Sequence, residues 1–226
     1  MKIAPIAYIH TDFPEKFGIP RQPGVVAELK GRIVFESEYR NPDMIRGLEE
    51  FSHIWLIWQF SKNLTEDGSS KFSPTVRPPR LGGNKRIGVF ATRSPFRPNP
   101  LGLSVVEIDR IEDNAAEGPV IYVKGADMVD GTPIYDIKPY IAYADSKPEA
   151  KGGFTDSLKY KTLKVEWDPV DIPENIKESL EKILSNDPRP HYQNDPDRVY
   201  GMSYAGYNVR FKVAGITLTV VTIDRA

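Results

Sequence analysis

Gly, Pro, Asn and Asp interrupt this chain so often that few segments are long enough to form a helix. Between these residues lie short stretches rich in β-branched and aromatic side chains, which is the pattern of β-strands. Short, frequent strands with few helices between them favour a closed antiparallel sheet over alternating βαβ units. The predicted strands are Ile3–His10, Ile33–Glu36, His53–Phe60, Ile87–Thr92, Leu103–Ile111, Val120–Lys124 and Thr132–Ile137.

Two helices are predicted. Asp43–Phe51 follows Pro42, a residue that suits the first turn of a helix. Pro173–Ser185 carries apolar residues at helical spacing, among them Ile176 and Leu180, and a proline follows its end. One face of this second helix must therefore be buried.

The segment Asp145–Tyr160 has few apolar residues and several Gly, Pro and Ser residues, as linkers and exposed loops do. Beyond it, two or three more strands are predicted at Arg198–Tyr204, Tyr207–Val213 and Ile216–Ile223. The predicted fold class is mainly β. It consists of a closed antiparallel β-barrel domain, a linker and a small α+β C-terminal domain over residues 1–145, 146–160 and 161–226.

Composition limits the classes of protein that this chain can belong to. With 226 residues, 40% of them hydrophobic and 27% charged, it can form a globular protein of one or two domains. The absence of cysteine excludes disulfides, a thiol nucleophile and cysteine-ligated metals. Met1–Phe13 lacks the pattern of a signal peptide, and the apolar run Ile54–Phe60 is too short to span a bilayer. We expect a cytoplasmic protein without a membrane anchor.

The formal net charge of −1 says nothing of the partner, but charge is distributed unevenly along the chain. Lys71–Val106 contains seven basic residues and no Asp or Glu, together with many prolines and glycines. Proline stiffens a loop, glycine lets backbone approach a ligand, and arginine binds phosphate or carboxylate. These loops suit an anionic or nucleotide-like ligand. A solvated basic surface with proline-rich turns explains the same composition equally well.

The stretch from Asp109 to Asp136 reverses this charge, with seven acidic residues and two basic ones. Asp130 precedes Gly131 and is interpreted as a turn residue. Asp127 is harder to explain by a turn. Its carboxylate is a candidate to accept a substrate proton or bind a ribose hydroxyl, and a salt bridge to a loop arginine is the alternative of equal weight.

Other catalytic arrangements find no support in the sequence. His10, His53 and His191 are scattered without the spacing of metal ligands, so no metal site is expected. The motifs of serine hydrolases, P-loop enzymes and dinucleotide-binding folds are absent. His53 and the neighbouring Trp55 are interpreted as packed strand residues.

The C-terminal part interleaves aromatic and basic side chains. Unstacked RNA bases pack on aromatic rings and arginine planes, while Lys and Arg bind the phosphates. RNA contact is therefore one interpretation, and a small domain with tyrosines in its core is the other. The interleaved residues are Arg189, His191, Tyr192, Arg198, Tyr200, Tyr204, Tyr207, Arg210 and Lys212.

Several long motifs resemble those of tRNA methyltransferase O, the TsaA-like family. They occur in the right order over nearly the whole chain, and motifs of this length are specific. The matching segments are Phe17–Gly24, Arg46–Trp55, Thr75–Asn84, Gly88–Ser104, Asp130–Pro133, Asp136–Tyr140, Asp187–Pro190 and Asn208–Arg210.

The resemblance implies a homodimeric β-barrel methyltransferase that uses S-adenosyl-L-methionine. Its substrate is tRNA that carries threonylcarbamoyladenosine next to the anticodon, and the methyl group goes to N6. Ser61 and Lys62 depart from the residues typical of the family, so a contact there is expected through the backbone. Transferred by motif, the cofactor residues are Gln22, Pro23, Gly24, Ser61, Lys62, Arg93, Leu103, Lys124, Gly125, Ala126 and Asp127.

The chemistry of this substrate suggests further roles. The modified N6–H belongs to a urea-type group and is more acidic than an adenine amine, so a weak base such as Asp127 or Asp136 suffices. Lys138, Tyr140 or Arg93 can offset charge on the neighbouring carbonyl. The residues predicted to contact the tRNA anticodon stem-loop are Arg77, Arg80, Arg97, Arg189, Tyr192, Arg210 and Lys212.

Two other classes of function remain open from the sequence. The first is a non-catalytic RNA-binding or small-ligand-binding module that keeps the fold without the chemistry. The second is an enzyme that acts on a small metabolite. A cofactor site distinguishes the methyltransferase from the first, and dependence on the C-terminal part distinguishes it from the second.

Overall fold

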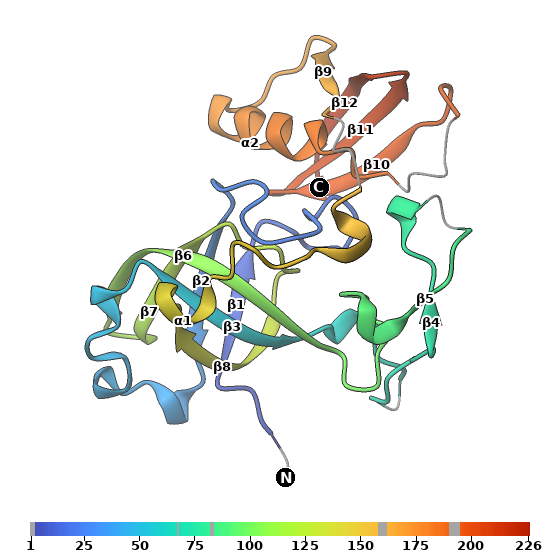
Figure 1. Cartoon of the computed structure of the whole chain (residues 1–226). Helices are drawn as coiled ribbons and strands as arrows, with labels where there is room; N and C mark the ends of the chain where they lie inside the picture. The colour runs from blue at the N-terminus through green and yellow to red at the C-terminus, as the bar shows by residue number, and fades with distance from the viewer. Residues whose placement is uncertain (1–2, 67, 82–83, 158–161, 190–194) are drawn as a thin grey trace.

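The first part of the chain forms a closed barrel of six antiparallel strands in the order β1-β2-β7-β6-β3-β8 (Figure 1). This confirms the predicted mainly β fold with its closed antiparallel barrel. The computed structural model describes residues 3–66, 68–81, 84–157, 162–189 and 195–226. The barrel strands are β1 (Ala7–Thr11), β2 (Lys30–Phe35), β3 (His53–Gln59), β6 (Leu101–Asn114), β7 (Gly118–Lys124) and β8 (Thr132–Pro139).

Alternate side chains of each strand fill the barrel. On β3, Ile54, Leu56 and Trp58 are buried, while the residues between them are partly exposed. Successive side chains of a strand point to opposite faces, so Trp55 and Trp58 lie on opposite sides of the sheet. Apolar residues from all six strands form this core, including Ile9, Ile33, Val106, Ile121 and Ile134.

Part of one strand prediction is wrong. Of the segment Ile87–Thr92, only Ile87–Gly88 forms a strand (β5), and it pairs with β4 (Thr75–Val76) outside the barrel. Val89–Ala91 instead forms a 3-10 turn, which ends where the Thr92 backbone N–H and hydroxyl both bind the carbonyl of Val89. The β-branched residues Ile87, Val89 and Thr92 are typical of a strand, but in the described part of the structure residues 89–92 pair with no neighbouring strand.

The predicted helix Asp43–Phe51 is also wrong. The segment folds into two 3-10 turns, Pro42–Ile45 and Leu48–Glu50. Gly47 separates them with a φ of 85°, which is incompatible with a continuous right-handed helix. The other short helical elements are 3-10 turns at Ser37–Tyr39, Ser61–Asn63, Pro79–Leu81 and Gly153–Thr155, and the helix α1 (Ala142–Asp145).

The C-terminal part forms a second sheet with the order β10-β11-β12-β9, covered by the helix α2 (Figure 1). The predicted second helix is confirmed, because α2 spans Glu174–Ser185 and buries Leu180, Ile183 and Leu184. No helix in the described ranges is long and apolar enough to cross a membrane. The strands are β9 (Lys164–Trp167), β10 (Tyr200–Tyr204), β11 (Tyr207–Ala214) and β12 (Thr217–Arg225).

A second core joins the C-terminal sheet to the segment between β1 and β2. Phe13, Val26 and Leu29 from this segment are buried together with residues of α2 and the C-terminal strands. Figure 1 shows the same blue segment between the barrel and the C-terminal sheet. Residues 13–29 are therefore held in place by the C-terminal part of the chain.

Candidate functional site

The site residues gather at one end of the barrel, as the strand registers show. β3 ends at Gln59 opposite Leu101, where β6 begins, and β7 ends at Lys124 opposite Lys30, where β2 begins. Neighbouring strands of an antiparallel barrel run in opposite directions, so the end of one strand lies beside the start of its neighbour. The connections after β1, β3 and β7 consequently emerge at the same end.

Two glycines bring two of these connections into contact. The Gly24 N–H donates to the Gly125 carbonyl at 3.0 Å, and the Gly125 N–H donates to the Leu29 carbonyl at 2.8 Å. Gly125 has a φ of 75°, and a Cβ there would lie 3.2 Å from the Cα of Gly24. A side chain at Gly125 is therefore disfavoured twice, by conformation and by space. We call Gly24 and Gly125 the glycine cradle.

The rest of the turn after β7 is held by the barrel. The Lys124 ammonium lies 2.6 Å from an Asp109 carboxylate oxygen, which directs this side chain along the barrel wall. Ala126 is buried in the barrel core. Gly125 is also buried, and its N–H and carbonyl are both hydrogen-bonded within the protein, so the half-buried Asp127 is the residue of this turn that is left to face a ligand.

Arg93 links the basic loop to the glycine cradle. Its guanidinium donates to Oε1 of Gln22, and Nε2 of Gln22 donates to the Arg21 carbonyl at 2.6 Å. Pro23, half-buried, lies between Gln22 and the cradle glycine. The predicted cofactor residues 22–24, Arg93 and the turn after β7 are therefore close together in space.

Asp127 has the most perturbed carboxyl group of this site. Burial raises its pKa to about 6, although a hydrogen bond from Ser104, one from the backbone N–H of Asp127 itself and the positive charge of Arg93 act to lower it. The Ser104 hydroxyl donates to Asp127 Oδ1 at 2.8 Å. Among the described residues, Asp127 has no salt bridge within 4.0 Å, so the alternative of an arginine pair is not realised. A carboxylate without a close cationic partner is suited to receive a proton or a cationic ligand.

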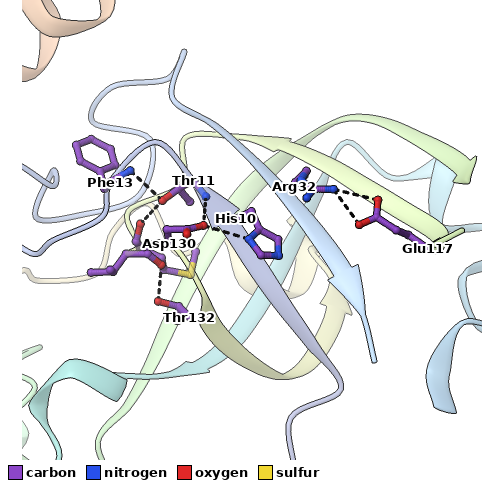
Figure 2. Close-up of polar contacts among 9 residues, drawn as sticks. His10, Thr11, Phe13, Arg32, Glu117, Asp130 and Thr132 are labelled. Atoms are coloured by element: carbon purple, nitrogen blue, oxygen red, sulfur yellow. Dashed lines mark hydrogen bonds and ion pairs between the residues drawn. The ribbon is translucent and has the colours of Figure 1, made fainter. Parts of the chain in front are cut away.

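Asp130 organises the neighbouring corner of the barrel (Figure 2). Its Oδ1 accepts from the Thr11 N–H at 3.1 Å and lies 3.2 Å from Nδ1 of His10. Gly131 follows with a φ of 71° and donates its N–H to the Ile9 carbonyl. Asp130 thus serves the turn by binding across to β1. In the described ranges, no three His, Asp or Glu side chains converge to hold a metal ion.

The remaining predicted cofactor residues flank the same end. Ser61 and Lys62 follow β3 in a 3-10 turn, and the Lys62 carbonyl accepts from the Lys16 ammonium at 3.0 Å. Leu103 is 54% exposed and pairs with Ile57, one of the partly exposed residues of β3. Paired residues share a face of the sheet, so Leu103 offers an apolar surface on the outside of the barrel.

Three predicted catalytic residues lie apart from Asp127. Asp136 pairs with Ile57 and Lys138 pairs with Trp55, so both face outward from β8. The Lys138 ammonium lies 2.9 Å from Asp136 Oδ2, and the Tyr140 ring packs against Trp55 with centroids 5.9 Å apart. Asp127 instead binds Ser104, which is buried inside. The four predicted catalytic residues therefore divide into two groups.

The predicted RNA contacts in the basic loops differ in exposure. Arg77 is exposed just after β4. Arg97 is half-buried, and its guanidinium donates to the carbonyls of Thr92 and Ser94 at 3.1 and 3.3 Å, which stabilises the loop itself. The side chain of Arg80 lies outside the described part of the structure.

The predicted contacts in the C-terminal part also differ. Arg189 is only 7% exposed and forms an ion pair with Asp187 at 2.9 Å. Arg210 is exposed on β11, and Lys212 on the same face is half-buried. Tyr192 lies outside the described residues. The predicted alternation on β11 is confirmed, because the apolar residues between these cations are buried.

Sequence reasoning missed two sets of residues at this end. Ser104 is 1% exposed and accepts a hydrogen bond from Nε1 of Trp58 at 3.0 Å. Its position between the apolar residues Leu103 and Val105 near the start of β6 was the available signal, and a weak one. The second set consists of Phe72, Phe90 and Phe96, exposed phenylalanines within the basic segment, and Phe90 is 79% exposed. Large apolar side chains in a cationic loop were the signal there.

Comparison with known proteins gives a consistent result. Residues 8–146 match the tRNA-methyltransferase O N-terminal domain, and residues 154–226 match the C-terminal domain of the same family. The Escherichia coli protein named tRNA (adenine(37)-N6)-methyltransferase is 37% identical over 97% of this chain and 96% of its own length. A Pseudomonas aeruginosa protein named putative S-adenosylmethionine-dependent methyltransferase is 38% identical over 88% of this chain and 87% of its own.

A solved structure of TrmO from Pseudomonas aeruginosa superposes with a TM-score of 0.77 and 29% identity, over 99% of this chain and 98% of that one. The two family models together cover both sheets of the fold, and the relatives align over nearly the whole chain. The chain therefore belongs to the tRNA methyltransferase O family.

Proposed function

We propose that this chain is an S-adenosylmethionine-dependent methyltransferase that acts on N6 of threonylcarbamoyladenosine next to the anticodon of tRNA. Its membership of the family and its full-length similarity to a protein named tRNA (adenine(37)-N6)-methyltransferase support the reaction class. The observation that carries the proposal is the location of Asp127. Its desolvated carboxyl group lies beside the glycine cradle and within the electrostatic influence of Arg93.

The residues at this end of the barrel fit the proposed cofactor. Gly24 is exposed, with open space where a Cβ would lie, so a ligand can approach the backbone there, and Gln22 provides an amide. Leu103 provides an exposed apolar surface on the outer face of β6, the face that also carries Asp136, because both residues pair with Ile57. Asp127 forms no salt bridge within the described part of the chain and can offset a ligand's positive charge. When bound here, S-adenosylmethionine supplies a methyl group carried by a positively charged sulfur.

The contribution of the protein to this reaction is mainly placement. A displacement at carbon gains most of its acceleration from holding the two reacting atoms at attack distance. In the proposed mechanism, Asp127 would accept the proton that leaves N6 as the new N–C bond forms and the methyl–sulfur bond breaks, which would leave a neutral thioether. A pKa of about 6 keeps most of this carboxyl group ionised at neutral pH, ready to act as a base.

The basic segment is the proposed surface for the anticodon loop. Arg77, Lys85 and Arg93 are exposed there, and Phe90 and Phe96 present apolar rings between these charges. Splayed RNA bases stack on such rings while cations bind the phosphates. Arg210 and Lys212 on β11 are proposed to extend this contact to a more distant part of the tRNA.

We also propose that the protein is a homodimer that works in the cytoplasm, and that its domain boundary lies within residues 146–160. The family resemblance supports the dimer, and the loop after α1 separates the two sheets in the chain. Light scattering after size exclusion measures the mass directly. A monomer of 25.5 kDa at micromolar concentration would contradict the dimer.

The test of the proposed function uses two tRNA substrates, one with and one without the threonylcarbamoyl group, and the free modified nucleoside as a third substrate. The full chain is incubated with S-adenosylmethionine, and the nucleosides are analysed by mass spectrometry. We expect one added methyl group on the modified adenosine and none on the unmodified tRNA. Cofactor binding without methyl transfer would instead indicate the non-catalytic module. Methylation of a free nucleoside at the same rate would indicate an enzyme of small metabolites.

A further inference from the structure

A line of hydrogen bonds runs through the barrel wall behind Asp127. The indole N–H of Trp58 donates to Ser104 Oγ at 3.0 Å, and the Ser104 hydroxyl donates to Asp127 Oδ1 at 2.8 Å. A hydroxyl has a single proton, so accepting from the indole leaves that proton for the carboxylate. The two hydrogen bonds therefore point in one direction, from the core to Asp127.

Packing fixes the position of Trp58, where this line of hydrogen bonds begins. Trp58 lies against the backbone of β6, because a Cβ at Gly102 would lie 2.2 Å from Cε2 of the indole. The ring also meets Phe60 edge-on, with centroids 4.4 Å apart. Trp58 and Ser104 are both buried, so their polar atoms cannot exchange these partners for bulk water. The indole N–H is thus held at Ser104 by the shape of its surroundings.

We propose that Trp58 and Ser104 are positioning residues, which hold one oxygen of the Asp127 carboxylate and leave its second oxygen for the substrate proton. This inference rests on the proposed function, because it gives Asp127 the role of base. The Ser104 hydrogen bond also favours the ionised carboxylate and so opposes the effect of burial. Loss of the Ser104 hydroxyl therefore raises the pKa of Asp127 and leaves the carboxyl group with only the hydrogen bond from its own backbone N–H.

The first test needs neither cofactor nor tRNA. The chain has three tryptophans, so nitrogen-15 labelling gives three indole signals, and Trp58→Phe identifies that of Trp58. We expect the Trp58 signal to shift with a midpoint near pH 6 in the wild-type chain, because Ser104 transmits the ionisation of Asp127. The shift should disappear in Asp127→Asn and in Ser104→Ala.

Trp55 provides the internal reference. Its indole donates to Asp145 at 3.0 Å, and this hydrogen bond and one from the Ile141 backbone lower the pKa of Asp145, so its signal should stay constant above pH 5. A constant Trp58 signal in the wild-type chain overturns the inference. So does a Trp58 titration that persists in Ser104→Ala.

The second test follows single-turnover methyl transfer against pH. Ser104→Ala should move the acidic limb upward by about one pH unit, since a hydrogen bond to a charged group is worth that much. Ser104→Thr, which keeps the hydroxyl, should restore the wild-type limb. If Ser104→Ala does not fold, Trp58→Phe should shift the limb in the same direction. An unchanged limb in the folded variants overturns the positioning role.

The two proposals fail in different ways. If the wild-type chain shows the Trp58 titration but transfers no methyl group to tRNA, the proposed function is wrong. If methyl transfer is normal and the Trp58 signal is constant, only the role of Trp58 and Ser104 is wrong.

Discussion

Asp127 lies where the fold works against the ionisation of its carboxyl group. Burial is the largest effect on its pKa, and neither Ser104 nor Arg93 compensates fully. The guanidinium of Arg93 donates to Gln22, and its positive charge lowers the pKa of Asp127 only from a distance. A buried ionisable group of this kind lowers the free energy of unfolding of the ligand-free protein, and such groups are typical of functional positions. Asp136, by contrast, is paired with Lys138 on the outer face of β8.

Asp127→Asn should stabilise the protein at high pH. The carboxyl group ionises near its ordinary pKa of 3.8 in the unfolded chain and at about 6 in the folded one. Between these values the folded state binds more protons, so the free energy of unfolding falls as the pH rises. We expect the variant to gain about 3 kcal/mol at pH 8 and much less at pH 4. Urea unfolding at both pH values measures this, and an equal difference at the two would contradict it.

The barrel strands hold in place the connections that carry the residues of the site. The glycine cradle joins the segment before β2 to the turn after β7, and only backbone atoms make the contact. The basic loop reaches the same place through Arg93. Three connections thus converge because the barrel places their strand ends together.

Gly125→Ala should disturb the cradle more than an equivalent change in the next turn. Both Gly125 and Gly131 have positive φ, so alanine costs about 1 kcal/mol of backbone strain at either position. A Cβ at Gly125 would also press on Gly24, whereas nothing lies within 4 Å of one at Gly131. We expect Gly125→Ala to weaken S-adenosylmethionine binding about tenfold or more, measured by calorimetry. Equal losses in the two variants would contradict the cradle.

Most strands and the helix α2 were predictable because their apolar residues recur at regular spacing. β9 was not predicted. It contributes only four residues, and its parallel pairing with β12 depends on a distant part of the chain. In the wrongly predicted helix Asp43–Phe51, residues that tolerate a helix lie on both sides of Gly47, and helix propensity does not reveal that this glycine adopts a positive φ. Local pattern identifies an element well only where neighbours do not decide its conformation.

The molecule as a whole combines a barrel that carries the site with a C-terminal sheet that holds one of its loops. Phe13, Val26 and Leu29 are buried in the C-terminal core, and residues 22–24 lie between them. Deleting the C-terminal part would therefore damage the cofactor site as well as any RNA contact. Point variants on the outer face of β11 separate these two effects.

Arg210→Gln and Lys212→Gln should weaken tRNA binding and leave cofactor affinity unchanged. Each lost phosphate contact should reduce the slope of the logarithm of affinity against that of salt concentration by about 0.7–0.9. Arg46→Gln is the matched control, because Arg46 is exposed and precedes β3 at the opposite end of the barrel. Filter binding at several salt concentrations gives the slopes. A slope that changes equally in the control would contradict an RNA contact on β11.

The motifs of the sequence identified the segments of the candidate site, but they did not show which side chains meet. Asp127 and Asp136 were equivalent as candidate bases, and only the barrel register separates them. Ser104 was only weakly marked, because one hydroxyl between apolar residues does not reveal which partners it binds. Arg97 and Arg189 resembled surface cations, yet their guanidinium groups bind within the protein. These distinctions depend on contacts between residues far apart in the chain.

Single-turnover methyl transfer to threonylcarbamoyl-modified tRNA, with Asp127→Asn and Asp136→Asn compared against the wild-type chain, tests the role of this barrel end directly. At saturating cofactor and tRNA, Asp127→Asn should lose a factor of about 10² or more, because a positioned base contributes at least that much. Its rate should also no longer fall at acidic pH with a midpoint near pH 6. Asp136→Asn should keep both the wild-type rate and this fall. Wild-type rates in Asp127→Asn across the pH range would contradict the proposed mechanism.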